Sequence, residues 1–131
     1  MELVRKIASY VETITPFYMS SLMDADLPEY ENRTQRVIKG YYPDVCYRDN
    51  DIIVIGEAKT DKDILNEHTE GQLLAYIEEV RNYGLQRHII YSVPFVVFIQ
   101  VKNMLKRLKE ARHIDDITFH VLDNFNRVVL L

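Results

Sequence analysis

The sequence has few of the residues that mark specialised architectures. Among 131 residues there are one cysteine, Cys46, four glycines and four prolines. A single cysteine excludes an internal disulfide framework, and four histidines without paired cysteines exclude a recognisable structural zinc site. So little glycine and proline excludes collagen-like and low-complexity chains. The longest apolar run, 93–99, stops at Gln100 and falls far short of the roughly 18 residues that span a bilayer.

The remaining composition is that of one globular domain. Hydrophobic residues make up 47% of the chain and charged residues 27%, so we expect residues 1–131 to form a single domain. The start of the chain lacks a signal-peptide core, and with the lone cysteine this predicts a cytoplasmic protein without membrane contact. The formal net charge of −4 excludes a protein that coats nucleic acid by bulk positive charge.

Periodic apolar residues predict three helices. In residues 2–14 the apolar side chains recur at spacings of three and four, which indicates one buried helical stripe. Residues 69–83 repeat the pattern up to Gly84. Pro94 suits the first turn of a further helix. Residues 17–30 give mixed signals and are interpreted as a short second helix plus a loop.

The other segments favour strands. Residues 36–47 are rich in valine, isoleucine and tyrosine, and a polar turn cluster at 48–51 indicates a hairpin. The second hairpin strand, 52–56, is apolar on both faces, as expected for a central strand with helices on both sides. Strands follow at 88–93 and, as the last element, at 117–122. The order predicts an α/β sandwich with a mixed central sheet flanked by helices.

Charged residues gather where the central strand ends. Glu57 and Lys59 project to the same side because side chains alternate along a strand. A two-residue turn at 49–50 would place Asp44 opposite Ile55 and diagonal to Glu57, at roughly 7 to 8 Å. Two carboxylates at that separation can share a hard cation such as magnesium. The alternative is a structural salt-bridge set of Asp44, Glu57 and Lys59.

This pattern resembles a known family. Pro43-Asp44, twelve intervening residues and then Glu57-Ala58-Lys59 on a hairpin resemble the signature of the PD-(D/E)XK nuclease superfamily. Downstream, Gln72 and Tyr76 are similar to the QxxxY motif of its RecB-like branch. The resemblance implies one nuclease-like domain over 1–131 with a restriction-endonuclease-like sandwich. Its αβββαβ core would begin with helix 2–14 and be followed by a C-terminal helix and strand.

The resemblance also implies hydrolysis of DNA phosphodiester bonds with Mg²⁺ or Mn²⁺. Asp44, Glu57 and the backbone carbonyl of Ala58 would hold the metal, and Lys59 would orient the attacking water. Gln72 and Tyr76 share a helix face, and the resemblance directs that face at the site as part of the catalytic set.

Many members of the family have a further metal-site acid on the leading helix. The candidates here are Glu12 and, after it, Glu2 or Glu31, and the sequence does not choose among them. An exposed acid on an amphipathic helix is the competing interpretation of Glu12. We assign no role to His68.

Several alternatives stay open. Thr69 and Gln72 fit a capping box, in which case Tyr76 would be a core residue. The chain could be a catalytically silent nuclease-fold protein that binds DNA or protein. It could also be an unrelated α/β interaction protein whose acidic segment binds a basic partner. Residues 44–79 form that segment, with ten acids and three bases. Because only one domain is present, a homodimer or a partner protein would supply the specificity of a nuclease.

Basic residues offer two candidate phosphate contacts. Residues 94–112 hold five bases and one acid. They include the helical stripe Lys102, Lys106 and Lys109, which could contact phosphates. The alternative is that this stripe is simply a solvent-exposed helix face. The basic residues nearer the carboxylates are Arg33, Arg36 and Lys39. We expect these three to be the better phosphate ligands.

Overall fold

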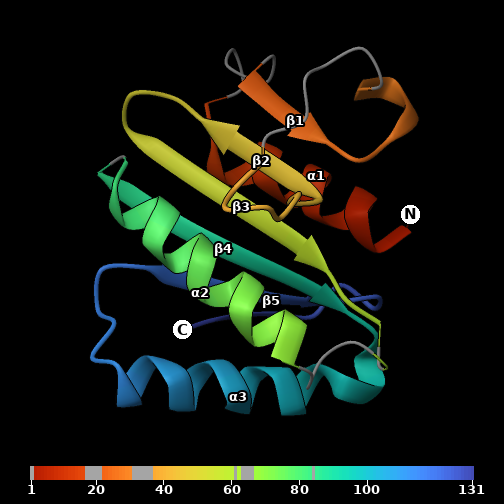
Figure 1. Cartoon of the computed structure of the whole chain (residues 1–131). Coiled ribbons are helices and arrows are strands. Elements are labelled where there is room, and N and C mark those ends of the chain that lie inside the picture. The colour runs from red at the N-terminus through yellow and green to blue at the C-terminus, as the bar shows by residue number, and fades with distance from the viewer. Residues whose placement is uncertain (1, 17–21, 31–36, 61, 63–66, 84) are drawn as a thin grey trace.

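The computed structural model describes residues 2–16, 22–30, 37–60, 62, 67–83 and 85–131. They form an α/β fold with a six-stranded mixed open sheet flanked by helices (Figure 1). The helices are α1 (Glu2–Ile14), α2 (Glu67–Arg81) and α3 (Phe98–Ala111), with short 3-10 helices η2 (Pro28–Tyr30) and η3 (Phe95–Val97). The strands are β1 (Met23–Ala25), β2 (Val45–Arg48), β3 (Ile52–Ala58), β4 (Gln86–Val93), β5 (Thr118–Asp123) and β6 (Val128–Leu130).

The strands lie in the sheet in chain order, from β1 to β6. β3, β4 and β5 are parallel, whereas β1 pairs antiparallel with β2, β2 with β3, and β5 with β6. The carboxyl ends of β3, β4 and β5 therefore meet at one edge of the sheet. β3 has a neighbour on each side, as the apolar pattern of 52–56 predicts.

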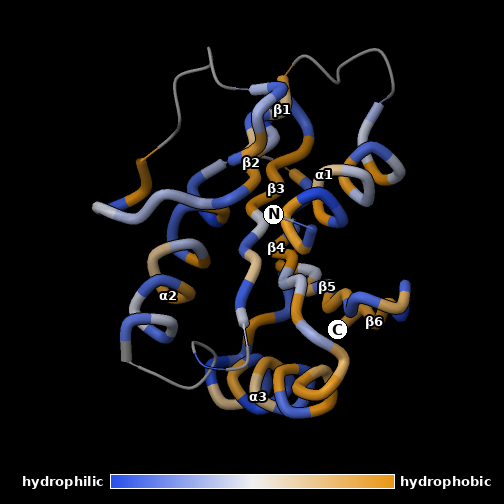
Figure 2. Tube along the Cα trace, turned by 90° about the vertical axis from the view of Figure 1, so that its right-hand side faces the viewer, coloured by the Kyte–Doolittle hydropathy of each residue, from blue (hydrophilic) through white to orange (hydrophobic). Residues whose placement is uncertain are grey.

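Helices cover both faces of the sheet. One core packs α1 against β2, β3 and β4, and the other packs α2 and α3 against the opposite face. Figure 2 shows α1 and α2 on opposite sides of the strands. Along β3, Ile53 and Ile55 belong to the core under α2, and Val54 belongs to the core under α1. Continued alternation turns Glu57 toward α2.

The predicted helix bounds need small corrections, and one segment was wrong. The helix predicted for 2–14 is observed at the same residues, whereas that for 69–83 runs over Glu67–Arg81. Gly84 lies outside the described residues. Residues 22–30 contain β1 and η2 and not a second α-helix, since the three-residue strand pairs with Tyr47, Cys46 and Val45. Residues 17–21 of that prediction also lie outside the described part.

The hairpin register differs from the predicted one by two residues. Arg48 pairs with Ile53 and Val45 with Gly56. The side chain of Asp49 causes this, because its Oδ1 accepts hydrogen bonds from the N–H groups of Asp51 at 2.7 Å and Ile52 at 2.8 Å. This Asx turn centres the reversal on residues 50–51. Asp44 is therefore directly beside Glu57 and not diagonal to it.

Two strand predictions also change in extent. Ile38 and Tyr41 form only an isolated bridge around a tight turn, in which Lys39 and Gly40 have φ of 50° and 86°; the first hairpin strand is therefore Val45–Arg48 alone. The strands predicted at 88–93 and 117–122 begin at Gln86 and Thr118. The second of them is not the last, because β6 follows it. Within the described residues, none of the helices is both long and apolar enough to cross a membrane.

Candidate metal and catalytic site

The candidate site lies where β2 begins and β3 ends. The last ladder pair is Val45 with Gly56, so the next residues outward, Asp44 and Glu57, are neighbours across the hairpin. Glu57 is 4% exposed, and Asp44 is half-buried. A side-chain hydrogen bond joins their two carboxyl groups. Asp44 also contacts the backbone, because its Oδ2 accepts a hydrogen bond from the N–H of Ala58 at 2.8 Å.

Two side chains from α2 hold Glu57. Gln72 Nε2 donates a hydrogen bond to Glu57 Oε1 at 2.8 Å, and the Tyr76 hydroxyl donates to the same oxygen at 2.7 Å. Gln72 is 5% exposed and Tyr76 is fully buried. The capping-box interpretation is wrong, because α2 begins at Glu67 and Thr69 lies inside the helix. The QxxxY pair therefore contacts the carboxylate of the ExK motif.

The electrostatics of this cluster oppose two ionised carboxylates. Burial, followed by the hydrogen bond and the charge of Asp44, raises the pKa of Glu57 to about 9, against the smaller opposing effects of Tyr76 and Lys59. Burial and the charge of Glu57 likewise raise the pKa of Tyr76 above its usual range. Two adjacent acids in a buried site need a proton or a cation between them.

The salt-bridge alternative predicts ion pairs between Lys59 and the carboxylates of Asp44 and Glu57, and the observed contacts differ from this prediction. Among the described residues, no direct ion pair joins Lys59 to Asp44 or Glu57. Its backbone N–H donates to the Ser92 carbonyl on β4 at 3.0 Å, which anchors the chain just beyond β3. The ammonium acts on Glu57 through space, lowering its pKa. Lys59 is thus adjacent to the carboxylates and not bonded to them.

Sequence reasoning missed Tyr91. It pairs with Glu57 across β3 and β4 and is 1% exposed. Burial and the Glu57 charge raise the pKa of its hydroxyl. Within the described part of the chain, neither the Tyr91 hydroxyl nor Gln72 Oε1 has a hydrogen-bond partner. Only the parallel register, which places Tyr91 beside Glu57, could have identified it.

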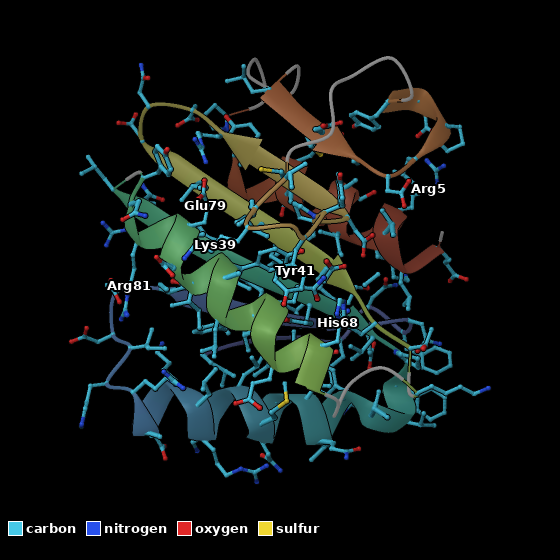
Figure 3. All side chains as sticks on the ribbon, in the orientation of Figure 1. Arg5, Lys39, Tyr41, His68, Glu79 and Arg81 are labelled. Atoms are coloured by element: carbon cyan, nitrogen blue, oxygen red, sulfur yellow. The ribbon has the colours of Figure 1, made fainter. Side chains whose placement is uncertain are left out.

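Tyr41 and His68 lie near the start of α2. Figure 3 shows them close together there, and their ring centroids are 5.4 Å apart. Tyr41 also lies 6.5 Å from the Tyr76 ring, edge to face. His68 is exposed, and no contact joins it to the carboxylates within the described residues.

The predicted third acid does not join the pair. Glu12 and Glu2 are exposed on α1, which packs on the face of the sheet opposite to Glu57. Glu31 lies outside the described residues. In the part of the chain that the structure describes, no three His, Cys, Asp or Glu side chains are grouped to hold a metal ion. The expectation that Glu12 is a ligand is therefore not supported.

The donors present nevertheless suit magnesium or manganese. Both carboxyl groups are hard oxygen donors. The N–H of Ala58 points toward Asp44, and its carbonyl shares that side because both groups of a strand residue face one neighbour. Magnesium commonly binds through one or two carboxylates and keeps several waters. The unpartnered polar atoms of Gln72 and Tyr91 are suited to hydrogen-bond such waters.

The predicted phosphate ligands are only partly placed. Arg33 and Arg36 lie outside the described residues. Lys39 forms an ion pair with Glu78 on the exposed side of α2, away from the carboxylates. On α3, Lys109 Nζ donates a hydrogen bond to the Ile117 carbonyl at 3.2 Å. This contact holds the Lys109 side chain against the residue that precedes β5. Lys106 is exposed, and Lys102 is half-buried.

Comparison of the chain with protein-family models, with curated proteins and with solved structures gave no match.

Proposed function

We propose that this protein is a metal-dependent DNA nuclease of the PD-(D/E)XK type, in a restriction-endonuclease-like sandwich. The observation that carries the proposal is the convergence of Asp44, Gln72 and Tyr76 on Glu57. Asp44 immediately precedes β2, Glu57 lies in β3 and the other two lie in α2, and all belong to motifs that resemble the family. A buried carboxyl group with three polar contacts and a strongly shifted pKa is typical of a functional site.

The chemistry assigns distinct tasks to the residues. Asp44, Glu57 and the Ala58 carbonyl would hold Mg²⁺ or Mn²⁺, which when bound supplies Lewis-acid activation of the phosphate and of a water. Lys59 orients that water and stabilises the negative charge that develops on the phosphate. Gln72 and Tyr76 fix the Glu57 carboxylate in one position.

The reaction is hydrolysis of a phosphodiester. The water oxygen forms a bond to phosphorus, and the bond between phosphorus and one ester oxygen breaks. The products are a phosphate monoester and an alcohol, with one water hydrogen passing through solvent to the departing oxygen. The rate enhancement comes from the geometry and charge of the site, without a covalent intermediate.

Melting and cleavage measured together test the proposal. Wild type, Asp44→Asn and Lys59→Ala are heated with and without Mn²⁺ and incubated with labelled DNA of several structures, with EDTA as the control. We expect Mn²⁺ to raise the wild-type Tm. Asp44→Asn loses both this shift and cleavage, because one anionic ligand is removed while the shape is kept.

Lys59→Ala should keep the Mn²⁺ shift and lose about a hundredfold or more in cleavage rate. If the cluster is only structural, Lys59→Ala instead lowers stability and Mn²⁺ has no effect on Tm. A wild-type protein that ignores Mn²⁺ and leaves every DNA intact contradicts the proposal.

A further inference from the structure

An exposed aromatic pair lies at the sheet edge that carries the candidate site. Phe95 follows β4 and Phe125 follows β5, and their ring centroids are 5.0 Å apart at an interplanar angle of 52°. These two residues are 50% and 67% exposed, and Val96 on η3 and Ile99 on α3 are 65% and 52% exposed. Large apolar side chains gathered at one place on the surface mark a binding surface.

Hydrogen bonds hold this pair in place. The buried Asp123 accepts at Oδ1 from the N–H groups of Phe125 at 2.8 Å and Arg127 at 2.9 Å. Asn124 Oδ1 accepts from the N–H of Phe95 at 2.7 Å, which ties the β5–β6 turn to the start of η3. Both rings therefore stand on fixed backbone, which lowers the entropy cost of binding a flat ligand.

A groove lined by three basic side chains lies on the other side of the same turn. It encloses about 520 Å³ between α1 and the β5–β6 turn, and its lining includes Arg5, Lys6 and Arg127 against the carboxylates of Glu2 and Asp123. Lys6 Nζ contacts Asn126 Oδ1 at 2.9 Å. The Arg127 side chain is 58% exposed and lies 4.8 Å from the centroid of the Phe98 ring. Arg5 is paired with Glu29 at 2.6 Å and Arg127 with Asp123 at 3.6 Å, so Lys6 is the groove cation without a carboxylate partner among the described residues.

The position relates the aromatic pair to the carboxylates. β4 is the neighbour of β3, and β5 is the next strand along. Parallel strands end at one edge (Figure 1), and neighbouring strands lie about 4.8 Å apart. The aromatic pair is therefore one and two strands away from the strand that carries Glu57. Aromatic faces near basic side chains are the combination that binds unpaired bases and their phosphates.

We infer that this edge binds single-stranded DNA, with bases stacked on Phe95 and Phe125 and phosphates in the groove beside Lys6 and Arg127. The inference rests on the proposed nuclease function and names its substrate as an unpaired strand. Duplex DNA keeps its bases stacked inside the helix and cannot use the two rings. A second copy of the chain would cover the apolar surface but would leave the Lys6 ammonium without a role.

Fluorescence anisotropy with a labelled oligothymidylate in EDTA tests the inference without cleavage. Phe125→Leu and Phe95→Leu keep apolar area but lose the stacking face, and each should weaken binding about tenfold. Phe125→Trp should bind as wild type or tighter. Leu85→Ala, which changes a residue 83% exposed at the opposite end of β4, is the matched control and should leave binding unchanged.

The groove is tested with Lys6→Gln, which should weaken binding and reduce the salt dependence by about one phosphate contact. Lys106→Gln, on the exposed side of α3, should change neither the affinity nor its salt dependence. Equal affinity of Phe125→Leu and wild type, or tighter binding of a duplex of equal length, overturns the inference. So does a wild-type dimer that Phe125→Ala dissociates, because the rings would then be an interface between copies.

A parallel cleavage assay with Mn²⁺ separates this inference from the proposed function. If wild type cleaves DNA while the leucine variants bind normally, only the single-strand surface is wrong. If the oligonucleotide binds as expected and no DNA is cleaved, the surface stands and the nuclease function is wrong. A wild type that neither binds nor cleaves contradicts both.

Discussion

The Tyr76 hydroxyl donates a 2.7 Å hydrogen bond to Oε1 of Glu57. It thereby joins the middle of α2 to the end of β3. Gln72 donates to the same oxygen from one turn earlier, so neither of these donors occupies the other oxygen, Oε2. The hydrogen bonds thus orient the carboxylate as well as stabilise it.

Tyr76→Phe tests this orienting role. The variant keeps the buried ring and removes one donor, so we expect a loss of about 1 kcal/mol in unfolding free energy. Loss of a group that positions a metal ligand should also weaken Mn²⁺ binding and cleavage by roughly 10- to 100-fold. Tyr42→Phe, at a tyrosine that is 56% exposed, is the control. Unchanged Mn²⁺ binding and cleavage with reduced stability would leave Tyr76 as a core residue only.

The local signals in the sequence predict much of the fold. The spacing of apolar residues predicts α1 at its observed bounds, and the unbroken apolar run at 52–56 predicts an interior strand. β1 and β6 have only three residues each, too few to show a period. Their pairing depends on neighbouring strands, which a local pattern does not contain.

The candidate site was predictable in its residues but not in its geometry. Asp44, Glu57, Lys59, Gln72 and Tyr76 are found by motif spacing. The predicted position of Asp44 was wrong because the Asp49 side chain accepts hydrogen bonds from two backbone N–H groups and thereby shifts the turn. Tyr91 reaches Glu57 only after the chain has crossed through α2, so no sequence spacing reveals the contact.

Buried His120 and half-buried His88 predict a loss of stability in acid. His120 Nδ1 lies 2.8 Å from the Tyr10 hydroxyl, and its Nε2 lies 2.8 Å from His88 Nδ1. Burial, and then the neighbouring His88, lowers the pKa of His120 to about 4, and burial lowers the pKa of His88. The folded protein therefore favours the neutral rings, whereas the unfolded chain takes up protons below about pH 6.5.

Stability should accordingly fall as the pH drops from about 6.5 toward 4, by up to about 3 kcal/mol from His120. Urea unfolding at several pH values measures the slope. His120→Gln removes the titrating ring and should flatten that slope even if its stability at pH 7 is lower. The exposed His113, replaced by asparagine, is the control and should keep the wild-type slope. An equally steep slope for His120→Gln would assign the acid sensitivity to other groups.

Gly56 provides a test of how α1 positions the site. A Cβ added there would lie 2.5 Å from Ile7 Cγ2 and 3.4 Å from Val45 Cβ. Gly56→Ala must therefore displace α1 or β3, and we expect a loss of about 1 to 3 kcal/mol in unfolding free energy. Cleavage should also fall, because Glu57 is the next residue.

A double-mutant cycle with Ile7→Ala checks the cause. Ile7→Ala alone leaves a cavity and destabilises the protein. In combination the alanine at 56 has room, so the double variant should lose less stability than the two single losses together. Strict additivity would show that the clash with Ile7 is not what makes glycine necessary at this position.

Tyr91 yields a prediction in which stability and activity change in opposite directions. Its hydroxyl is buried beside Glu57 without a partner among the described residues. An unsatisfied buried hydroxyl costs about 1 to 3 kcal/mol, so Tyr91→Phe should raise the unfolding free energy by a similar amount. Tyr47→Phe is the matched control. Its hydroxyl donates to Asp49 Oδ2 at 2.6 Å, and its removal should destabilise the protein.

Cleavage by Tyr91→Phe should nevertheless fall about tenfold or more. The hydroxyl lies beside the carboxylate that would bind the metal, and a water of the metal's coordination shell would give it the partner it lacks. Buried polar groups that break the local rules concentrate at functional sites, where they reduce stability. A variant that is more stable and cleaves as wild type would show that the hydroxyl serves no step of the reaction. A variant that is less stable would show instead that the hydroxyl has a bonding partner in the folded protein.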